Sequence, residues 1–312
     1  MFRTGFCTLD QYLRAGDRRR YSGSRASYSL LDVGDHPTEE EIRAFEDISF
    51  TLRTSNGTFR TSFRQRFGDI DAAAIRLIDR LWSSETELLV QDRAASHALT
   101  SLEFAEQLLA RFPRACVEAS DLVLYLVRLG RPGGEVWIAE PDGSPLQWAK
   151  PPFVVSLRHR EPWRFPINHL IAAWAKWRFH RLRLPPNWLE LPEIADYRVE
   201  RISCIHPHAR QLSRRDSRFQ LRERSVFDSD PASCDVLRTM NIFNKAYFSG
   251  EQLAQGALAA FASLRPGGLW IVGRTLEHDF SNHVTFLRRG ESGWEVLERI
   301  GAGSEMEEFA LR

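Results

Sequence analysis

One stretch, residues 87–112, constrains the fold of this chain more than any other. It begins with a short apolar run that stops at Asp92 and continues through a loop rich in alanine and serine. An amphipathic helix then carries apolar residues at helical spacing as far as Phe112. A strand, a tight loop of small residues and a helix N-terminus are the usual place where an α/β protein holds a nucleotide-like ligand. The sequence therefore predicts a ligand-binding loop at residues 92–100, although the glycines usual in such loops are absent.

The segment that follows predicts a second strand, at residues 114–120, that ends at Asp121. Two strands joined by one helix form a βαβ unit, which crosses over right-handedly and makes the strands parallel. An acidic side chain at the end of the second strand can hydrogen-bond a ribose hydroxyl. Glu118 and Asp121 are the candidates, and Asp121 is preferred because it stands where the strand gives way to a loop. We also expect Thr100 and Glu103 to form a capping box on the intervening helix.

The α/β alternation returns later in the chain. We expect strands at residues 199–205, 219–225, 234–240 and 269–275, a helix at 250–264 and an antiparallel hairpin within 283–300. The predicted fold class is therefore α/β. It comprises a Rossmann-like, doubly wound, mostly parallel sheet with an antiparallel edge hairpin, a helical N-terminal region and a helical and hairpin insert.

Two regions stand apart from this alternation. Residues 1–84 have helical patterns at 38–50 and 69–82 and predict a mostly helical N-terminal cap, which leaves 85–312 as the Rossmann-like domain. Residues 131–196 form an insert with a predicted hairpin around Pro141-Asp142-Gly143 and a basic, tryptophan-rich helix within 167–182. We expect this insert to be a lid. Its helix could lie on a membrane surface, but packing on the sheet or covering a bound molecule is favoured, so we do not expect membrane contact.

Composition excludes several functional classes. The formal net charge is +1, so no global field draws the chain to nucleic acid, and we expect no nucleic-acid partner. The four cysteines are scattered without a CxxC pair, which argues against a zinc site and a disulfide framework. The sequence contains no signal peptide and no apolar run of about 18 residues. We therefore expect a soluble, cytoplasmic protein.

Three features, taken in order, resemble one family. They are the loop at 92–100 with its helix, the element Ala119-Ser120-Asp121, and a strand from Asp235 that runs to Asn241 and Tyr247-Phe248. A helix follows and ends in the turn at 264–268, which leads into an apolar strand. This order is similar to the class I S-adenosylmethionine-dependent methyltransferases, and within them it looks most like the CheR-type chemotaxis methyltransferases. The resemblance covers residues 87–130 and 197–290.

The resemblance implies S-adenosylmethionine (SAM) as the cofactor. It also implies a set of cofactor-binding residues: Asp92, Ala94, Ser96, Thr100, Asp121, Leu122, Phe227, Asp228 and Asn241. In this set Asp121 would bind the ribose, Leu122 would lie against the adenine, and Asn241 would lie near the sulfonium. Ala94, Ser96 and Ala98 stand where glycines are usual in the family.

Methyl transfer is an in-line displacement in which the enzyme mainly aligns donor and acceptor. A carboxylate acceptor needs no base, whereas a hydroxyl or amine acceptor gains from one. The candidate catalytic residues are His206, His208 and Tyr247. The two histidines could bind a metal together, but no further ligand stands at a suitable spacing, so we expect no metal.

We expect O- or N-methylation of a small-molecule or peptide acceptor, with tryptophans of the insert, Trp137, Trp148, Trp163, Trp174 and Trp177, walling the acceptor. A homodimer is compatible with the sequence. The alternative is a non-catalytic Rossmann-like protein that binds SAM or serves in assembly. The absent loop glycines and the lack of an obvious base favour that alternative.

Overall fold

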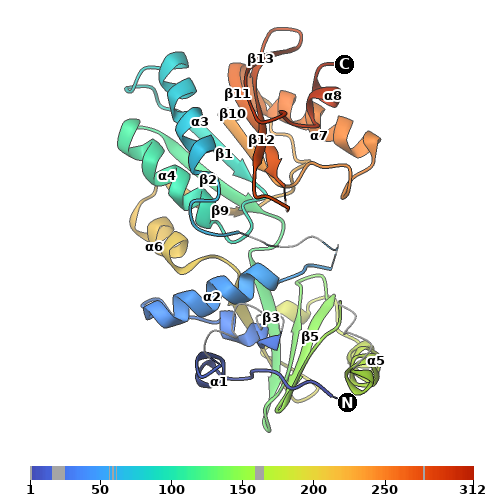
Figure 1. Cartoon of the computed structure of the whole chain (residues 1–312). Coiled ribbons are helices and arrows are strands. Elements are labelled where there is room, and N and C mark those ends of the chain that lie inside the picture. The colour runs from blue at the N-terminus through green and yellow to red at the C-terminus, as the bar shows by residue number, and fades with distance from the viewer. Residues whose placement is uncertain are drawn as a thin grey trace. The chain divides into compact units, whose positions relative to one another are not determined.

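The structure is a computed structural model that describes residues 2–15, 25–55, 57, 60, 62–158, 165–276 and 278–312. It consists of two compact units, each built from two separate stretches of chain (Figure 1). Unit 1 comprises Met1–Phe63 and Val123–Pro207, and unit 2 comprises Arg64–Leu122 and His208–Arg312. These boundaries differ from the predicted ones, because the helix predicted at 69–82 belongs to unit 2.

Unit 2 is organised around a mostly parallel sheet. Seven strands in its described residues pair in the order β13-β12-β11-β10-β1-β2-β9. They are β1 (Leu89–Arg93), β2 (Cys116–Asp121), β9 (Phe219–Glu223), β10 (Cys234–Met240), β11 (Leu264–Thr275), β12 (Asn282–Arg289) and β13 (Trp294–Ile300). The first five run parallel, and β12 and β13 form an antiparallel hairpin at one edge. Counted within the unit, the order is the 3-2-1-4-5 of a doubly wound fold, so the predicted α/β class is confirmed.

Helices cover both faces of this sheet (Figure 1). They are α3 (Gly68–Leu81), α4 (Leu99–Arg111), α6 (Pro207–Arg215), α7 (Gly250–Ser263) and α8 (Glu307–Ala310). Successive residues of a strand point to opposite faces, and β10 follows this rule. Leu237 packs in one core with Leu253 of α7, whereas Arg238 bonds to Asp71 of α3.

Unit 1 contains an antiparallel sheet. Six strands in its described residues pair in the order β6-β5-β4-β3-β8-β7. They are β3 (Tyr125–Arg131), β4 (Glu135–Ala139), β5 (Pro145–Lys150), β6 (Phe153–Ser156), β7 (Glu193–Ile194) and β8 (Tyr197–Ser203). The predicted hairpin is present as β4 and β5. The strand expected at 199–205 is β8. It pairs with β3 and does not continue the Rossmann-like sheet, which corrects our assignment.

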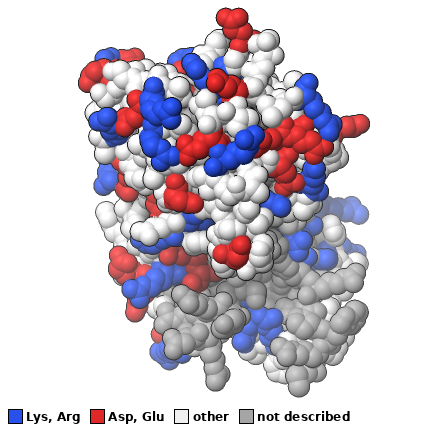
Figure 2. Space-filling view, turned by 45° about the horizontal axis from the view of Figure 1, so that its top comes forward, with Lys and Arg blue, Asp and Glu red and all other residues white. Residues whose placement is uncertain are grey.

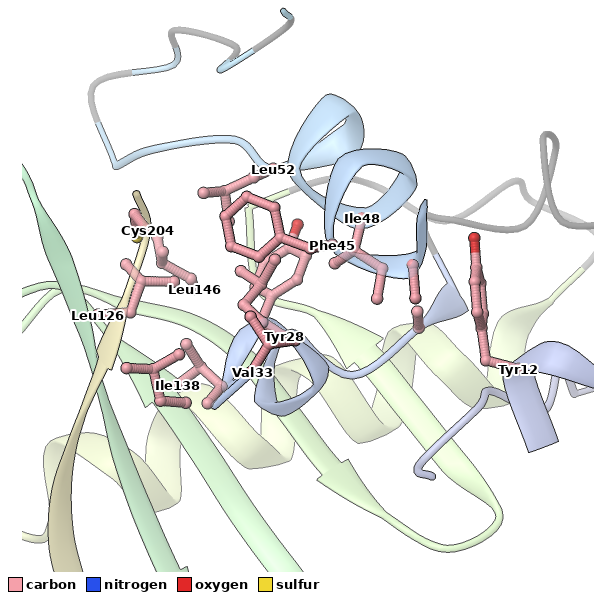
Figure 3. Packing of buried hydrophobic residues seen from close by; sticks show 14 residues of the cluster. Tyr12, Tyr28, Val33, Phe45, Ile48, Leu52, Leu126, Ile138, Leu146 and Cys204 are labelled. Carbon is pink, nitrogen blue, oxygen red and sulfur yellow. The ribbon is translucent and has the colours of Figure 1, made fainter. Parts of the chain in front are cut away.

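The helices of unit 1 pack on both faces of its sheet. They are α1 (Leu9–Leu13), η3 (Tyr28–Leu31), α2 (Glu39–Thr51), α5 (Pro166–His180) and η4 (Trp188–Glu190). Leu126 of β3 packs in a cluster with Phe45 of α2, and Figure 3 shows this cluster beneath the helix. The next residue, Val127, belongs to a second cluster on the other face, with Phe179 of α5. Because successive side chains of β3 point to opposite faces of the sheet, this one strand contributes to two separate cores.

The tryptophans expected to wall an acceptor divide into two groups. Trp137 and Trp148 are buried in the second cluster of unit 1 and therefore serve as core residues. Trp174 and Trp177 of α5 are exposed, and Trp163 lies outside the described residues. The role of the insert as a lid stays a prediction.

Charge on the surface and the state of the cysteines can be compared with the sequence predictions. On the face shown in Figure 2, basic and acidic side chains are interspersed, as the net charge of +1 leads one to expect. The four cysteines, all within the described ranges, are free. In the described part of the chain, no helix is both long enough and apolar enough to cross a membrane.

Candidate functional site

The strand order of unit 2 changes direction between β1 and β10, and this point defines the candidate site. From β1 the chain passes through α4 to β2 on one side, and from β10 it passes through α7 to β11 on the other. Ligands of doubly wound proteins bind where the carboxyl ends of strands meet at such a switch point. The register places Arg93 of β1 beside Ser120 of β2 and Thr239 of β10. The segments that follow these three strands therefore begin at one edge of the sheet.

The loop after β1 has an uncommon backbone. Ala94, Ser96 and Ala98 have φ angles of 62°, 57° and 63°, which lie in the left-handed region. A residue with a Cβ atom loses roughly 1–2 kcal/mol in this region, and glycine is the usual occupant. Three alternate residues of one short loop thus adopt the conformation for which glycine is the usual residue, although none of them is glycine.

The start of α4 differs from its prediction. Ala98 is the N-cap residue and no side chain caps the helix, so the expected capping box of Thr100 and Glu103 is absent. The Glu103 carboxylate instead accepts hydrogen bonds from the Gln65 amide, at 2.9 and 3.0 Å. The left-handed residue at 98 starts the helix earlier than the sequence pattern indicates. Thr100 therefore lies inside the first turn, where it is buried.

Hydrogen bonds from β2 hold the loop in place. The Ser120 carbonyl accepts from the Ala95 amide at 2.9 Å, and the Asp121 Oδ2 atom accepts from the Ser96 amide at 2.8 Å. The Ala98 amide donates to the Ala95 carbonyl at 2.8 Å. The structure thus joins Ser96 and Asp121, two of the predicted cofactor-binding residues. Leu122, directly after Asp121, is 56% exposed.

Asp92 is not open to a ligand. Its side chain is buried, and its Oδ2 atom accepts from Ser101 Oγ and from Arg238 Nη1, each at 2.6 Å. Arg238 also donates through Nη2 to Asp71 Oδ1 at 3.1 Å. The rings of Phe67 and Phe104 lie 4.9 and 5.1 Å from the guanidinium carbon. Asp92 therefore belongs to a buried ionic cluster.

Charges inside this cluster are strongly perturbed. Burial raises the pKa of Asp71 to about 7 against the opposing effect of Arg238, and the nearby Asp92 and Glu103 raise it further. Burial acts to lower the pKa of Arg238, but Asp71 and Asp92 outweigh it and raise that pKa above its usual value. Sequence reasoning missed Arg238. The available signal was an arginine in the middle of an otherwise buried strand.

Arg93 is a second buried arginine that the sequence did not single out. Its guanidinium donates to Gln91 Oε1 and Ser263 Oγ, and it also donates to the carbonyl of Asp228. Burial lowers the pKa of Arg93. The bond to Asp228 ties the segment after β9 to β1. The neighbouring Phe227 ring packs edge-on against Phe248 at 5.2 Å.

The loop after β10 supplies the other predicted contacts. Asn241 has a φ of 61°, its amide donates to the Gly273 carbonyl at 2.8 Å, and its Oδ1 accepts from the Thr275 amide at 2.7 Å. The Asn241 side chain therefore joins the ends of β10 and β11. Tyr247 lies further along the same segment and is 40% exposed.

The two candidate histidines belong to different units. His206 belongs to unit 1, where its ring is buried, lies 3.1 Å from Glu46 Oε1 and contacts Phe45 edge-on. His208 belongs to unit 2 and lies in α6. Among the described residues, no group of three or more His, Cys, Asp or Glu side chains is arranged to hold a metal ion.

Neither the protein-family models nor the curated proteins searched include a match to this chain. Several solved structures that resemble it are methyltransferases by name. One is 1,6-didemethyltoxoflavin-N1-methyltransferase from Burkholderia thailandensis with bound 1,6-didemethyltoxoflavin and S-adenosylhomocysteine. It has 13% identity and a TM-score of 0.32, and the match covers 78% of this chain and 63% of that one.

Two further structures give similar values. An O-methyltransferase family protein from Burkholderia thailandensis has 11% identity and a TM-score of 0.31, with 87% of this chain and 54% of that one covered. Human N-acetylserotonin methyltransferase in complex with SAM has 9% identity and a TM-score of 0.31, with 86% and 48% covered. The chain thus spans about half to two thirds of the length of these proteins. At these scores, the likeness assigns the chain neither to a family nor to a function.

Proposed function

We propose that unit 2 binds SAM at the loop 94–98 and Asp121, and transfers its methyl group to a small-molecule or peptide acceptor as an O- or N-methyl group. The observation that carries this proposal is the run of three left-handed residues, Ala94, Ser96 and Ala98, at the switch point. Such strain persists where the surrounding structure enforces it, and it concentrates at ligand sites. The proposal includes the CheR-type relationship indicated by the sequence.

The residues at the edge of the sheet fit the adenosine half of the cofactor better than the methionine half. Asp121 is a partly exposed carboxylate at the end of β2, and it is followed by the exposed Leu122. A ribose hydroxyl would share or replace the bond that Asp121 now accepts from Ser96. Phe227 and Asp228 would lie near the adenine. Asp92, by contrast, would not contact the cofactor. It would support the loop by holding Ser101 in the first turn of α4.

Bound SAM would supply an activated methyl group, and the chain's own residues would bind, orient and shield it. Ser96 and the loop backbone would fix the donor, Thr100 would support the loop from within α4, and Asn241 would keep the β10 loop in position. Tyr247 is the candidate residue for contact with the acceptor, because its side chain is exposed. His208 remains a candidate base, whereas the burial of His206 against Glu46 favours a structural role.

A second candidate function is a non-catalytic protein of the same fold. Specific observations favour it: the side chains of Asp92, Asp121 and Asn241 all accept hydrogen bonds from the protein itself. In that case unit 2 would bind SAM without turnover, or would serve only in assembly. We place either form in the cytoplasm, in keeping with the four free cysteines.

Calorimetry with SAM and with S-adenosylhomocysteine tests the proposal. We expect binding by the wild type and at least about tenfold weaker binding by Asp121→Asn, because hydrogen bonds to a charged acceptor contribute about 1.5–3 kcal/mol. The control is Glu106→Gln, which changes an exposed acid on α4 and should leave the affinity unchanged. If neither compound binds the wild type at tens of micromolar protein, the proposal fails. Binding with no methyl transfer to any acceptor favours the second candidate.

A further inference from the structure

Helix α5 of unit 1 exposes a line of large apolar side chains. Ile167, Leu170, Trp174 and Trp177 are 40%, 71%, 42% and 56% exposed. Their spacing of three, four and three residues places them along one side of the helix. We call these four residues the outer stripe. A continuous apolar line on a surface helix indicates an interaction site, unlike single exposed apolar residues.

The outer stripe is exposed although the helix is firmly held. The opposite side of α5 is buried, with Ala175 and Phe179 in the core cluster on the sheet. Arg178 donates to Glu135 Oε1 at 2.7 Å, and this buried carboxylate also accepts from Trp148 and Tyr197. The exposure of the outer stripe therefore does not arise from a detached helix.

The charged residues of the segment that carries the outer stripe have one sign. From Pro166 to Arg183 the chain has four Lys or Arg residues and no Asp or Glu, in a protein whose net charge is +1. The Arg181 guanidinium carbon lies 4.7 Å from the centre of the Trp177 ring, and that of Arg178 lies 5.1 Å from the centre of the Trp174 ring. Lys176 and Arg183 are exposed. Apolar and aromatic side chains are thus combined with positive charge at the C-terminal end of the helix and in the residues just after it.

We propose that the outer stripe of α5 binds the surface of an anionic lipid bilayer, with the helix lying flat in the interface. Tryptophan prefers the headgroup level of a bilayer, where its ring is partly apolar and partly wet. Long basic side chains can keep their charge among lipid phosphates while their stems cover apolar surface. Amphipathic helices that lie in the interface combine these two residue types. The proposal is independent of the proposed function, because it depends only on unit 1.

Size argues against a protein as the occupant. A stable protein interface uses about 20–30 residues a side, whereas the outer stripe has four residues on a helix of 15 residues. That helix is about 22 Å long. A bilayer needs no matching groove, and a single helix inserted by about 5–10 Å is sufficient. The observations therefore favour a lipid surface over a protein partner or a second copy of the chain.

Flotation of the full-length chain with vesicles tests this inference. We expect the protein to bind phosphatidylcholine vesicles that contain phosphatidylserine, and to bind pure phosphatidylcholine vesicles far more weakly. The double variant Leu170→Ser with Trp177→Ser should bind at least about tenfold more weakly, because it removes two inserting side chains. The triple variant Lys176→Gln, Arg181→Gln, Arg183→Gln should lose about a hundredfold on the anionic vesicles.

The matched control is Leu258→Ser, which changes an equally exposed leucine, 71%, on α7 of unit 2. It should bind like the wild type. Each variant is first compared with the wild type by circular dichroism, and the exposed positions should leave the spectrum unchanged. Failure of the wild type to float with anionic vesicles overturns the inference, as does equal loss of binding in Leu258→Ser. Self-association that the double variant abolishes, without vesicle binding, would identify a protein contact instead.

Discussion

Arg238 shows how much a single buried charge can constrain a fold. Only 1% of the Arg238 side chain is exposed, and its guanidinium faces the carboxylates of Asp71 and Asp92. Two acids facing one base leave a buried negative charge unless one acid keeps its proton, and an unpaired buried charge is costly. The raised pKa of Asp71, about 7, agrees with a proton held there. The cluster is therefore closest to neutral when Asp71 is protonated.

This arrangement predicts a stability that depends on pH. The pKa of Asp71 rises from 3.8 in the unfolded chain to about 7 in the folded one. The folded state therefore binds more protons between these values. The contribution of Asp71 is fully present below about pH 4 and is lost as the pH rises through about 7. Between about pH 5 and about pH 8, the unfolding free energy of the wild type should fall as the pH rises. In Asp71→Asn this fall should be shallower than in the wild type, by up to about 1.4 kcal/mol per pH unit.

Urea unfolding followed by tryptophan fluorescence measures this slope. The control is Asp79→Asn, because Asp79 forms a partly exposed ion pair with Arg111 and such pairs contribute little. Its slope should match that of the wild type. If Asp71→Asn and the wild type lose stability in parallel, the proton is not held at Asp71.

At the scale of elements, the loop between β1 and α4 predicts an unusual response to glycine. Ala94 is partly exposed and has a φ of 62°. Ala94→Gly should therefore stabilise the protein by about 0.5–1 kcal/mol, since relief of the left-handed strain outweighs the larger entropy of glycine in the unfolded chain. Ala72→Gly, at an exposed position inside α3, should instead cost about 1 kcal/mol. Thermal unfolding of both variants measures the contrast, and destabilisation by both would mean that the loop is not strained.

Most elements of unit 2 could be predicted because their signals are local. The strand predicted at 234–240 is β10, the helix predicted at 250–264 is α7 with one residue fewer, and the closing hairpin is β12 and β13. Each has its apolar pattern within one continuous segment. The loop conformation could not be predicted, because alanine and serine at 94, 96 and 98 do not indicate a left-handed backbone. Only the contacts with Ser120 and Asp121 hold it there.

Pairings between distant segments explain the remaining differences. The alternation of apolar and polar residues in β8 would suit a strand in either of the two sheets. Only its pairing with β3, about 70 residues earlier, assigns it to unit 1. The Arg238 cluster likewise joins α3, β1 and β10. Helix α5 has apolar residues on two sides, of which one is buried and the other is exposed. From the sequence pattern alone, both sides are expected to pack against the rest of the protein.

At the scale of the whole molecule, we expect unit 1 to unfold as one cooperative structure, because two distant segments of the chain share its core. Phe45 of α2 shares its core cluster with Leu126, Ile138 and Ile202 of the sheet. Phe45→Ala should therefore cost about 3–5 kcal/mol and reduce hydrogen-exchange protection in both stretches of unit 1 together. The matched variant Phe50→Ala, on the same helix but at a position 42% exposed, should change little. Loss of protection confined to residues 25–63 would show that the two stretches are not one cooperative unit.

The discontinuity of unit 1 also imposes an order of events during translation. The first stretch ends at Phe63, and the second ends at Pro207, about 140 residues later. At about 5–20 residues per second, a ribosome needs roughly 7–30 s to synthesise these residues. Until β3, β4 and β5 have been synthesised, Phe45 and Ile48 have no sheet to cover, and we expect the nascent chain to display an apolar helix that chaperones can bind. Unit 1 therefore completes its core only after β1, α4 and β2 have left the ribosome.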